Sequence, residues 1–146
     1  MATKTVNRDV ANLRKSVERL DAAQTERIAT ASPGDVVRQG DLYLVCLESP
    51  TGGEIIHETQ LAPGNTQGSR HVVEGDCVIR RGPEVVKAVQ ALHGTVPMEL
   101  VGPSLECDSD CTVTHPQHGH RILPSGSSWA VVYQRQFAED IRRMQD

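Results

Sequence analysis

The chain has 146 residues, a length that fits one domain and can bury a core without disulfide staples. The formal net charge of −4 gives no bulk attraction to nucleic acid or to an anionic membrane, so we expect neither as a partner. Aromatic residues make up only 3%, so the core must be built mostly from Val, Leu, Ile and Ala.

The first residues do not resemble a secretory signal, because charged side chains interrupt them and no apolar stretch follows. No run approaches the roughly 18 apolar residues that a membrane span requires. We therefore expect a cytoplasmic protein, or a virion component if a phage encodes the chain. In that setting the four cysteines are expected to be thiols or ligands rather than a disulfide framework.

Residues 5–29 are predicted to form an amphipathic helix, with residues 1–32 as an N-terminal arm and residues 33–146 as a β-rich domain. The helix carries one narrow apolar stripe at heptad spacing, made by Val6, Val10, Leu13, Val17 and Leu20. Val at a positions with Leu at d positions suits a parallel two-stranded coiled coil. The stripe can pack on its own domain, or it can join the chain to a second copy or a larger protein lattice. Its narrowness favours association.

From Gly34 onward the pattern changes to short strands. Gly-Asp pairs at residues 34–35, 40–41 and 75–76 each precede an apolar run. The run Leu42–Leu47 is apolar on both faces, which predicts a central strand. Cys46 and Cys77 fall inside such runs and are expected to be buried, inert thiols.

Residues 83–93 are predicted to form a short helix, because Pro83 suits its first turn and Gly94 suits its C-terminal end. Residues 95–101 are predicted to form a strand that Gly102 and Pro103 end. In the last predicted strand, residues 128–137, Trp129 and its alternate neighbours share one face. About six to eight strands predict a mainly β fold, a sandwich or small barrel, with the N-terminal helix and one internal helix.

Five potential metal ligands lie within fourteen residues of each other: Cys107, Cys111, His115, His118 and His120. Because zinc is held by three or four thiolate or imidazole donors, this group is the candidate site for zinc or iron. The spacing lacks the paired cysteines of a zinc finger. Two other interpretations stay open, namely side chains that cap a hairpin and a local disulfide between Cys107 and Cys111.

The pair His118-Gly119-His120 resembles the His-x-His motif on which cupins carry their metal. That resemblance implies a cupin-like metal domain with His71 as a distant ligand, but the acidic ligand of the motif has no counterpart here. The sequence also contains no G-x-S-x-G, H-E-x-x-H or G-x-G-x-x-G pattern. We therefore expect no enzymatic activity and, apart from the candidate metal, no cofactor.

The last third carries a further resemblance, through His115-Pro-Gln-His118-Gly119, Leu123-Pro124-x-Gly126 and the run Val131–Phe137. With Gly40-Asp41 earlier in the chain, these motifs resemble a group of small bacterial and phage-associated proteins. The chain departs from the group at Gln136, where an acidic residue is usual. The resemblance implies a compact β-domain and favours a structural role in a virion or another assembly. The leading expectation is thus a non-enzymatic, self-associating protein.

Overall fold

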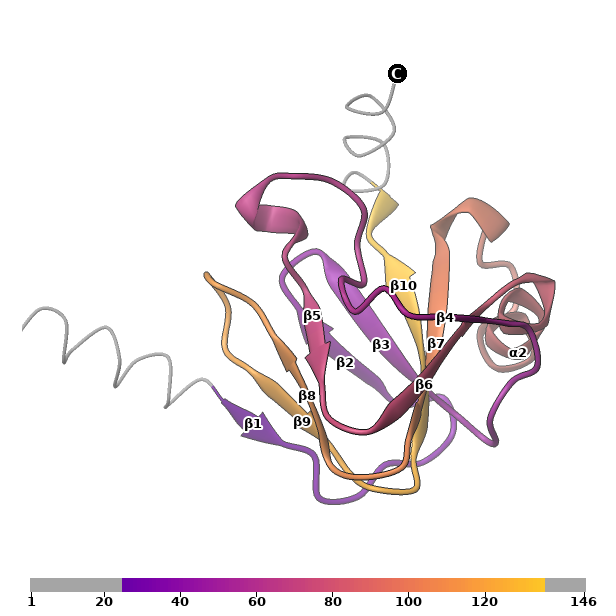
Figure 1. The fold of residues 1–146 in the computed structure, drawn as a ribbon. Helices are drawn as coiled ribbons and strands as arrows, with labels where there is room; N and C mark the ends of the chain where they lie inside the picture. The colour runs from indigo at the N-terminus through magenta and orange to yellow at the C-terminus, as the bar shows by residue number, and fades with distance from the viewer. Residues whose placement is uncertain (1–24, 136–146) are drawn as a thin grey trace, which may run out of the picture.

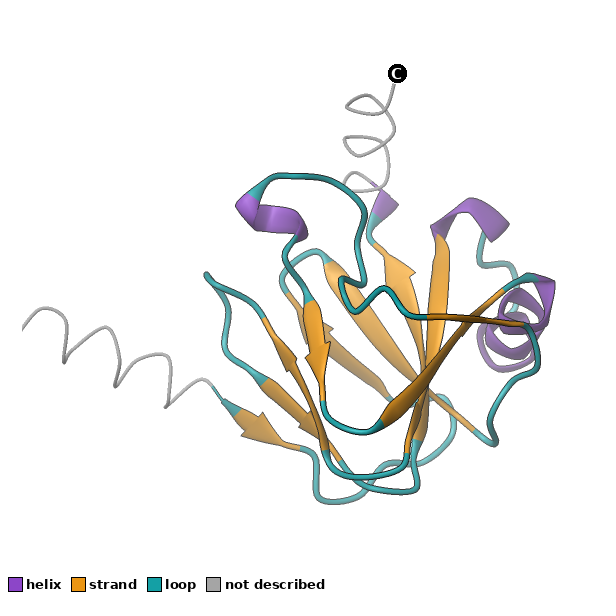
Figure 2. Cartoon of the chain, in the orientation of Figure 1, coloured by secondary structure: helices purple, strands orange, loops and turns teal. Residues whose placement is uncertain are grey.

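The structure is a computed structural model that describes residues 25–135. This part of the chain holds ten strands, one α-helix and two short 3-10 helices (Figures 1 and 2). The strands are β1 (Glu26–Arg27), β2 (Val36–Gln39), β3 (Leu42–Leu47), β4 (Glu54–Ile56), β5 (Val72–Glu74), β6 (Cys77–Arg81), β7 (Val101–Cys107), β8 (Cys111–Thr114), β9 (Arg121–Leu123) and β10 (Ser128–Tyr133). The helices are η1 (Gln67–Ser69), α2 (Pro83–His93) and η2 (Met98–Leu100).

The strands form two sheets. The smaller sheet has the order β1-β9-β8-β5, and the larger sheet has the order β2-β3-β10-β7-β6-β4 (Figure 1). Every described pair is antiparallel except β1 with β9, which run parallel. The predicted mainly β fold is therefore confirmed for the described residues, while the stripe of the predicted N-terminal helix lies outside them.

Two hydrophobic clusters lie on opposite faces of the larger sheet. One lies between the sheets and draws side chains from β3, β7 and β10 of the larger sheet and from β5, β8 and β9 of the smaller one. The other lies under α2, where Val85 and Val89 are fully buried against Val45, Ala130 and Val132. The domain thus has three layers, in the order small sheet, large sheet and helix (Figure 2).

Strands β3 and β10 are buried on both faces, as the apolar run at Leu42–Leu47 predicts. Along β10, Trp129 and Val131 point into the cluster between the sheets, while Ala130 and Val132 point toward α2. This alternation confirms the face assignment made from the sequence. Helix α2 also begins at Pro83 and ends at His93 as predicted.

The prediction of a strand at residues 95–101 is wrong. These residues include η2, and the strand that follows, β7, runs through Gly102 and Pro103 instead of stopping there. Proline is tolerated because the register between β7 and β10 shifts at this point: Ala130 pairs with Ser104 but Val132 pairs with Val101. The missing N–H of Pro103 therefore falls at a β-bulge, where no ladder bond is lost.

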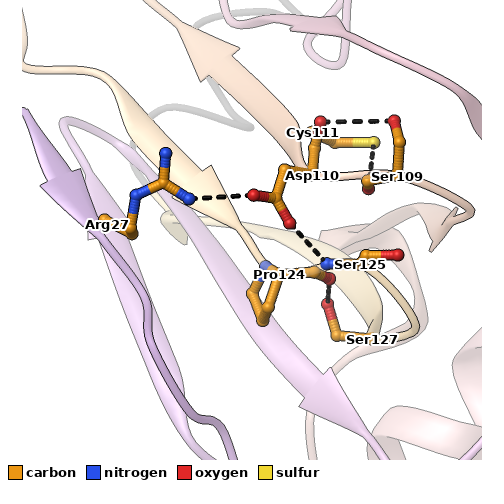
Figure 3. Close-up of polar contacts among 7 residues, drawn as sticks. All are labelled: Arg27, Ser109, Asp110, Cys111, Pro124, Ser125 and Ser127. Carbon is orange, nitrogen blue, oxygen red and sulfur yellow. Dashed lines mark hydrogen bonds and ion pairs between the residues drawn. The ribbon is translucent and has the colours of Figure 1, made fainter.

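The predicted helix over residues 5–29 is wrong at its end, since Glu26 and Arg27 form β1 and pair with Arg121 and Ile122 of β9. A side-chain contact reinforces this pairing, because the Arg27 guanidinium donates to the Asp110 carboxylate at 2.8 Å (Figure 3). The second Asp110 oxygen accepts the Ser125 backbone N–H at 2.9 Å. The helical spacing of apolar residues along a segment does not reveal that the end of the segment pairs its backbone with a neighbouring strand.

Candidate functional site

Three histidines gather at one end of the smaller sheet. His71 comes directly before β5 and His115 directly after β8, and the register that pairs Val72 with Thr114 places these two histidines opposite each other. Their ring centroids lie 4.3 Å apart, and the His118 ring lies 4.6 Å from that of His115. The three imidazoles therefore form a continuous row of tilted rings, which we call the histidine stack, from the fully buried His71 to the exposed His118.

Gln39, at the end of β2, fixes the inner end of this stack. Its fully buried amide nitrogen donates to the carbonyl oxygens of Val113 at 2.9 Å and Gly119 at 3.0 Å. The amide oxygen lies 2.8 Å from Nδ1 of His71. Because both amide hydrogens are used, that oxygen must be the acceptor, so the neutral His71 carries its proton on Nδ1.

The tautomer of His115 follows by the same reasoning. The backbone N–H of Gln117 donates to Nδ1 of His115 at 3.0 Å, so the ring proton lies on Nε2. That proton is donated to the carbonyl oxygen of Gly68, 3.2 Å away. These hydrogen bonds agree with the capping interpretation that the sequence left open, since the His115 ring joins the turn after β8 to the η1 segment.

Burial keeps the inner histidines neutral. Burial, together with the neighbouring His115 and His118 rings, lowers the pKa of His71 to about 3. Burial likewise lowers the pKa of His115, against the opposing effect of its hydrogen bond to Gly68. Both side chains are thus uncharged at neutral pH.

The five residues of the candidate metal site separate into two groups. Cys107 and Cys111 are buried at one end of β8, whereas His115 and His118 follow its other end. The four residue steps from Cys111 to His115 along an extended chain span about 13 Å, too far for a shared metal ion. His120 lies just before β9, where its carbonyl oxygen accepts the Glu26 N–H at 2.9 Å.

Both ring nitrogens of His115 hold hydrogen bonds in this structure. Its one ring lone pair, on Nδ1, accepts the Gln117 N–H, so it is not directed at a metal ion here. Across residues 25–135, no group of three or more His, Cys, Asp or Glu side chains has a geometry suited to holding a metal. In this structure the stack connects β2, η1 and the turn after β8 through hydrogen bonds.

A recess of about 740 Å³ opens elsewhere, beside the end of β10. Its lining is mostly apolar and includes Pro63, Gly64 and Asn65 from the segment between β4 and β5. The Tyr133 hydroxyl there donates to the Leu61 carbonyl oxygen at 2.8 Å, and burial raises its pKa to about 12. This volume lies in the range of small-molecule pockets, but its charged lining is limited to Glu58 and Arg81.

The sequence did not predict that Gln39 contacts the histidines or that Cys77 lies beside the other two cysteines. Gln39 carried no signal beyond its place before a Gly-Asp turn, although a polar residue at the end of an apolar strand is a possible hint. Cys77 was expected to be a buried, inert thiol, whereas the structure leaves it half-buried beside Cys107 and Cys111. The contact of Gln39 with His71 and the pairing of Cys77 with Cys107 each join residues about 30 or more positions apart in the chain.

A comparison with protein-family models, curated proteins and solved structures found no match for this chain. Among the described residues, no helix has the length and apolar character needed to cross a membrane.

Proposed function

We propose that this chain is a non-enzymatic assembly protein that associates with copies of itself or with a larger protein lattice through its N-terminal stripe. One observation carries the proposal. The described residues 25–135 contain two hydrophobic clusters, built by both sheets and α2. The stripe of Val6, Val10, Leu13, Val17 and Leu20 lies outside these residues, and its heptad spacing suits a partner helix.

The ionisable groups of the interior support a structural rather than a catalytic role. Burial lowers the pKa of His71 and raises the pKa of Cys46, Cys77 and Tyr133, so each of these groups is neutral at pH 7. General acid–base and nucleophilic catalysis instead need a group whose pKa lies near the working pH. The last third of the chain resembles a group of small bacterial and phage-associated proteins. This resemblance favours a virion shell as the larger lattice.

The point of attachment also suits association. Residue 25 leads directly into β1, which lies at the edge of the smaller sheet (Figure 1). A segment that precedes an edge strand can reach a second molecule without crossing its own core. The exposed Val36 side chain on β2, at the edge of the larger sheet, adds apolar surface to the domain.

Leu13→Glu is expected to abolish self-association of the full chain. A carboxylate at a central d position would have to be buried in the seam, which weakens association by about 100-fold for a cost of roughly 3 kcal/mol. Light scattering coupled to size-exclusion chromatography should give a multiple of 15.9 kDa for the unmodified chain and the single-chain mass for the variant.

The matched control is Asn12→Glu, which adds the same charge one position away, off the stripe. It should elute like the unmodified chain. A strictly monomeric unmodified chain at the highest attainable concentration, with no added partner bound, would overturn the self-associating form of the proposal. Equal effects of the two substitutions would show that charge rather than the stripe controls association.

A further inference from the structure

Three of the four cysteines meet where the two sheets come together. Cys77 begins β6, Cys107 ends β7 and Cys111 begins β8. Cys77 and Cys107 are direct partners in the antiparallel register of β6 with β7. Cys46 lies on β3, on the far side of β10 from this group, where it pairs with Trp129.

The backbone hydrogen bonds of Cys107 show whether Cys77 and Cys107 form a hydrogen-bonded or a non-hydrogen-bonded pair of the antiparallel ladder. The N–H of Cys107 donates to the Ser127 carbonyl oxygen at 2.9 Å, and its own carbonyl accepts the Gly126 N–H at 2.7 Å. Both backbone groups of Cys107 therefore point away from β6. The two cysteines form a non-hydrogen-bonded pair, in which the Cα atoms of facing residues lie about 4.5 Å apart. That separation lies at the lower end of the range that disulfides span.

Cys111 completes the cluster. Its thiol lies close enough to those of Cys77 and Cys107 to raise the pKa of both. Its sulfur also lies 3.4 Å from the Asp76 carbonyl oxygen. It lies 3.3 Å from the Ser109 carbonyl oxygen, a contact drawn in Figure 3. Space for this thiol depends on Gly75, because a Cβ there would lie 3.2 Å from the sulfur.

Solvent access differs among the three thiols. Cys77 is half-buried, whereas Cys107 and Cys111 are only 1% and 0% exposed. A small oxidant therefore meets Cys77 first, and the nearest resolving thiol directly across the ladder is Cys107.

We propose that Cys77 and Cys107 are a redox modification site that forms a reversible cross-strand disulfide with a small-molecule disulfide such as oxidised glutathione. The Cys77 thiolate attacks one sulfur of the oxidant, and one glutathione leaves as a thiolate that takes up a proton. The Cys107 thiolate then attacks the Cys77 sulfur of the mixed disulfide and releases the second glutathione. Two protein thiols and one oxidised glutathione thus become one protein disulfide and two reduced glutathiones.

Burial, together with the nearby Cys111 thiol, raises the pKa of Cys77 to about 11. Only a small fraction is therefore thiolate at neutral pH. Because the thiolate is the attacking species, the rate of cross-linking should rise about tenfold per pH unit between pH 7 and 9.

Peptide mapping of the full chain after incubation with oxidised glutathione tests the proposal. Trypsin separates Cys77 from Cys107 at Arg80, and a proteinase that cuts before aspartate separates Cys107 from Cys111 at Asp108. We expect one cross-link, between the peptides of Cys77 and Cys107, which reductant removes. The number of free thiols in denaturant should fall from four to two. A cross-link through Cys111, stable glutathione adducts alone, or four unchanged thiols would each overturn the assignment.

Variants sharpen this result. Cys107→Ala should abolish the intramolecular cross-link, while Cys111→Ala and the distant control Cys46→Ala should keep it. Far-UV circular dichroism and urea unfolding of each variant establish that it is folded. If Cys107→Ala does not fold, the map of the unmodified chain still decides which two cysteines pair.

Discussion

Acidification from pH 6.5 towards pH 3 is expected to destabilise the domain strongly through His71. The folded pKa of this side chain is about 3, against about 6.5 in the unfolded chain, so the unfolded state binds the proton more tightly. The contribution of neutral His71 to stability is therefore complete above pH 6.5 and is lost as the pH falls. The slope approaches 1.4 kcal/mol per pH unit, for a total of about 4–5 kcal/mol at pH 3.

Urea unfolding between pH 7.5 and pH 4 measures this slope. His71→Asn retains an amide N–H near the position of Nδ1 but cannot be protonated in this range, so it should flatten the pH dependence below pH 6.5. The matched control is His57→Asn, because His57 is exposed and should leave the slope unchanged. An identical slope in His71→Asn and the unmodified chain would show that protonation of this imidazole is not the cause.

Gln39→Met is expected to lower the free energy of unfolding by about 3–4 kcal/mol. Methionine keeps the length of the side chain but removes three buried hydrogen bonds, to Val113, Gly119 and His71. The lost amide oxygen matters most, because it accepts the proton that His71 carries on Nδ1. Chemical denaturation at pH 7.5 gives the change.

Gln60→Met is the control for this substitution. The Gln60 amide nitrogen also donates to two backbone carbonyl oxygens, those of Ala62 at 2.7 Å and Gly64 at 2.9 Å, but the residue is only half-buried. Water can replace these bonds, so the expected loss is about 1 kcal/mol. Losses of equal size at the two positions would contradict the assignment of Gln39 as a buried joint between β2, β8 and the histidine stack.

The elements that sequence predicted well are those whose signal is local. The apolar run at Leu42–Leu47 and the alternation along Ser128–Tyr133 correspond to β3 and β10, because burial on one or both faces follows directly from a two-residue period. Pro83 and Gly94 bracket α2 because both act on the backbone within one helical turn. Short edge strands such as β1 and β4 have too few residues to show a period.

The candidate site was predicted less well, since its members were chosen by nearness in sequence. Cys111 and His115 lie four positions apart, yet an extended strand separates them by about 13 Å. Pairing between strands instead joins each of them to residues far away in the chain. His115 lies against His71, and the Cys111 thiol lies against Cys77.

The sequence by itself determined a mainly β chain with two-sided central strands and one internal helix, because hydrophobic periods and turn residues act over a few positions. Only the tertiary structure decided the strand order, the bulge that accommodates Pro103, and the separation of the thiols from the imidazoles. These features depend on register between distant segments. A change of one residue in register exchanges the two faces of a strand, so register decides which side chains meet.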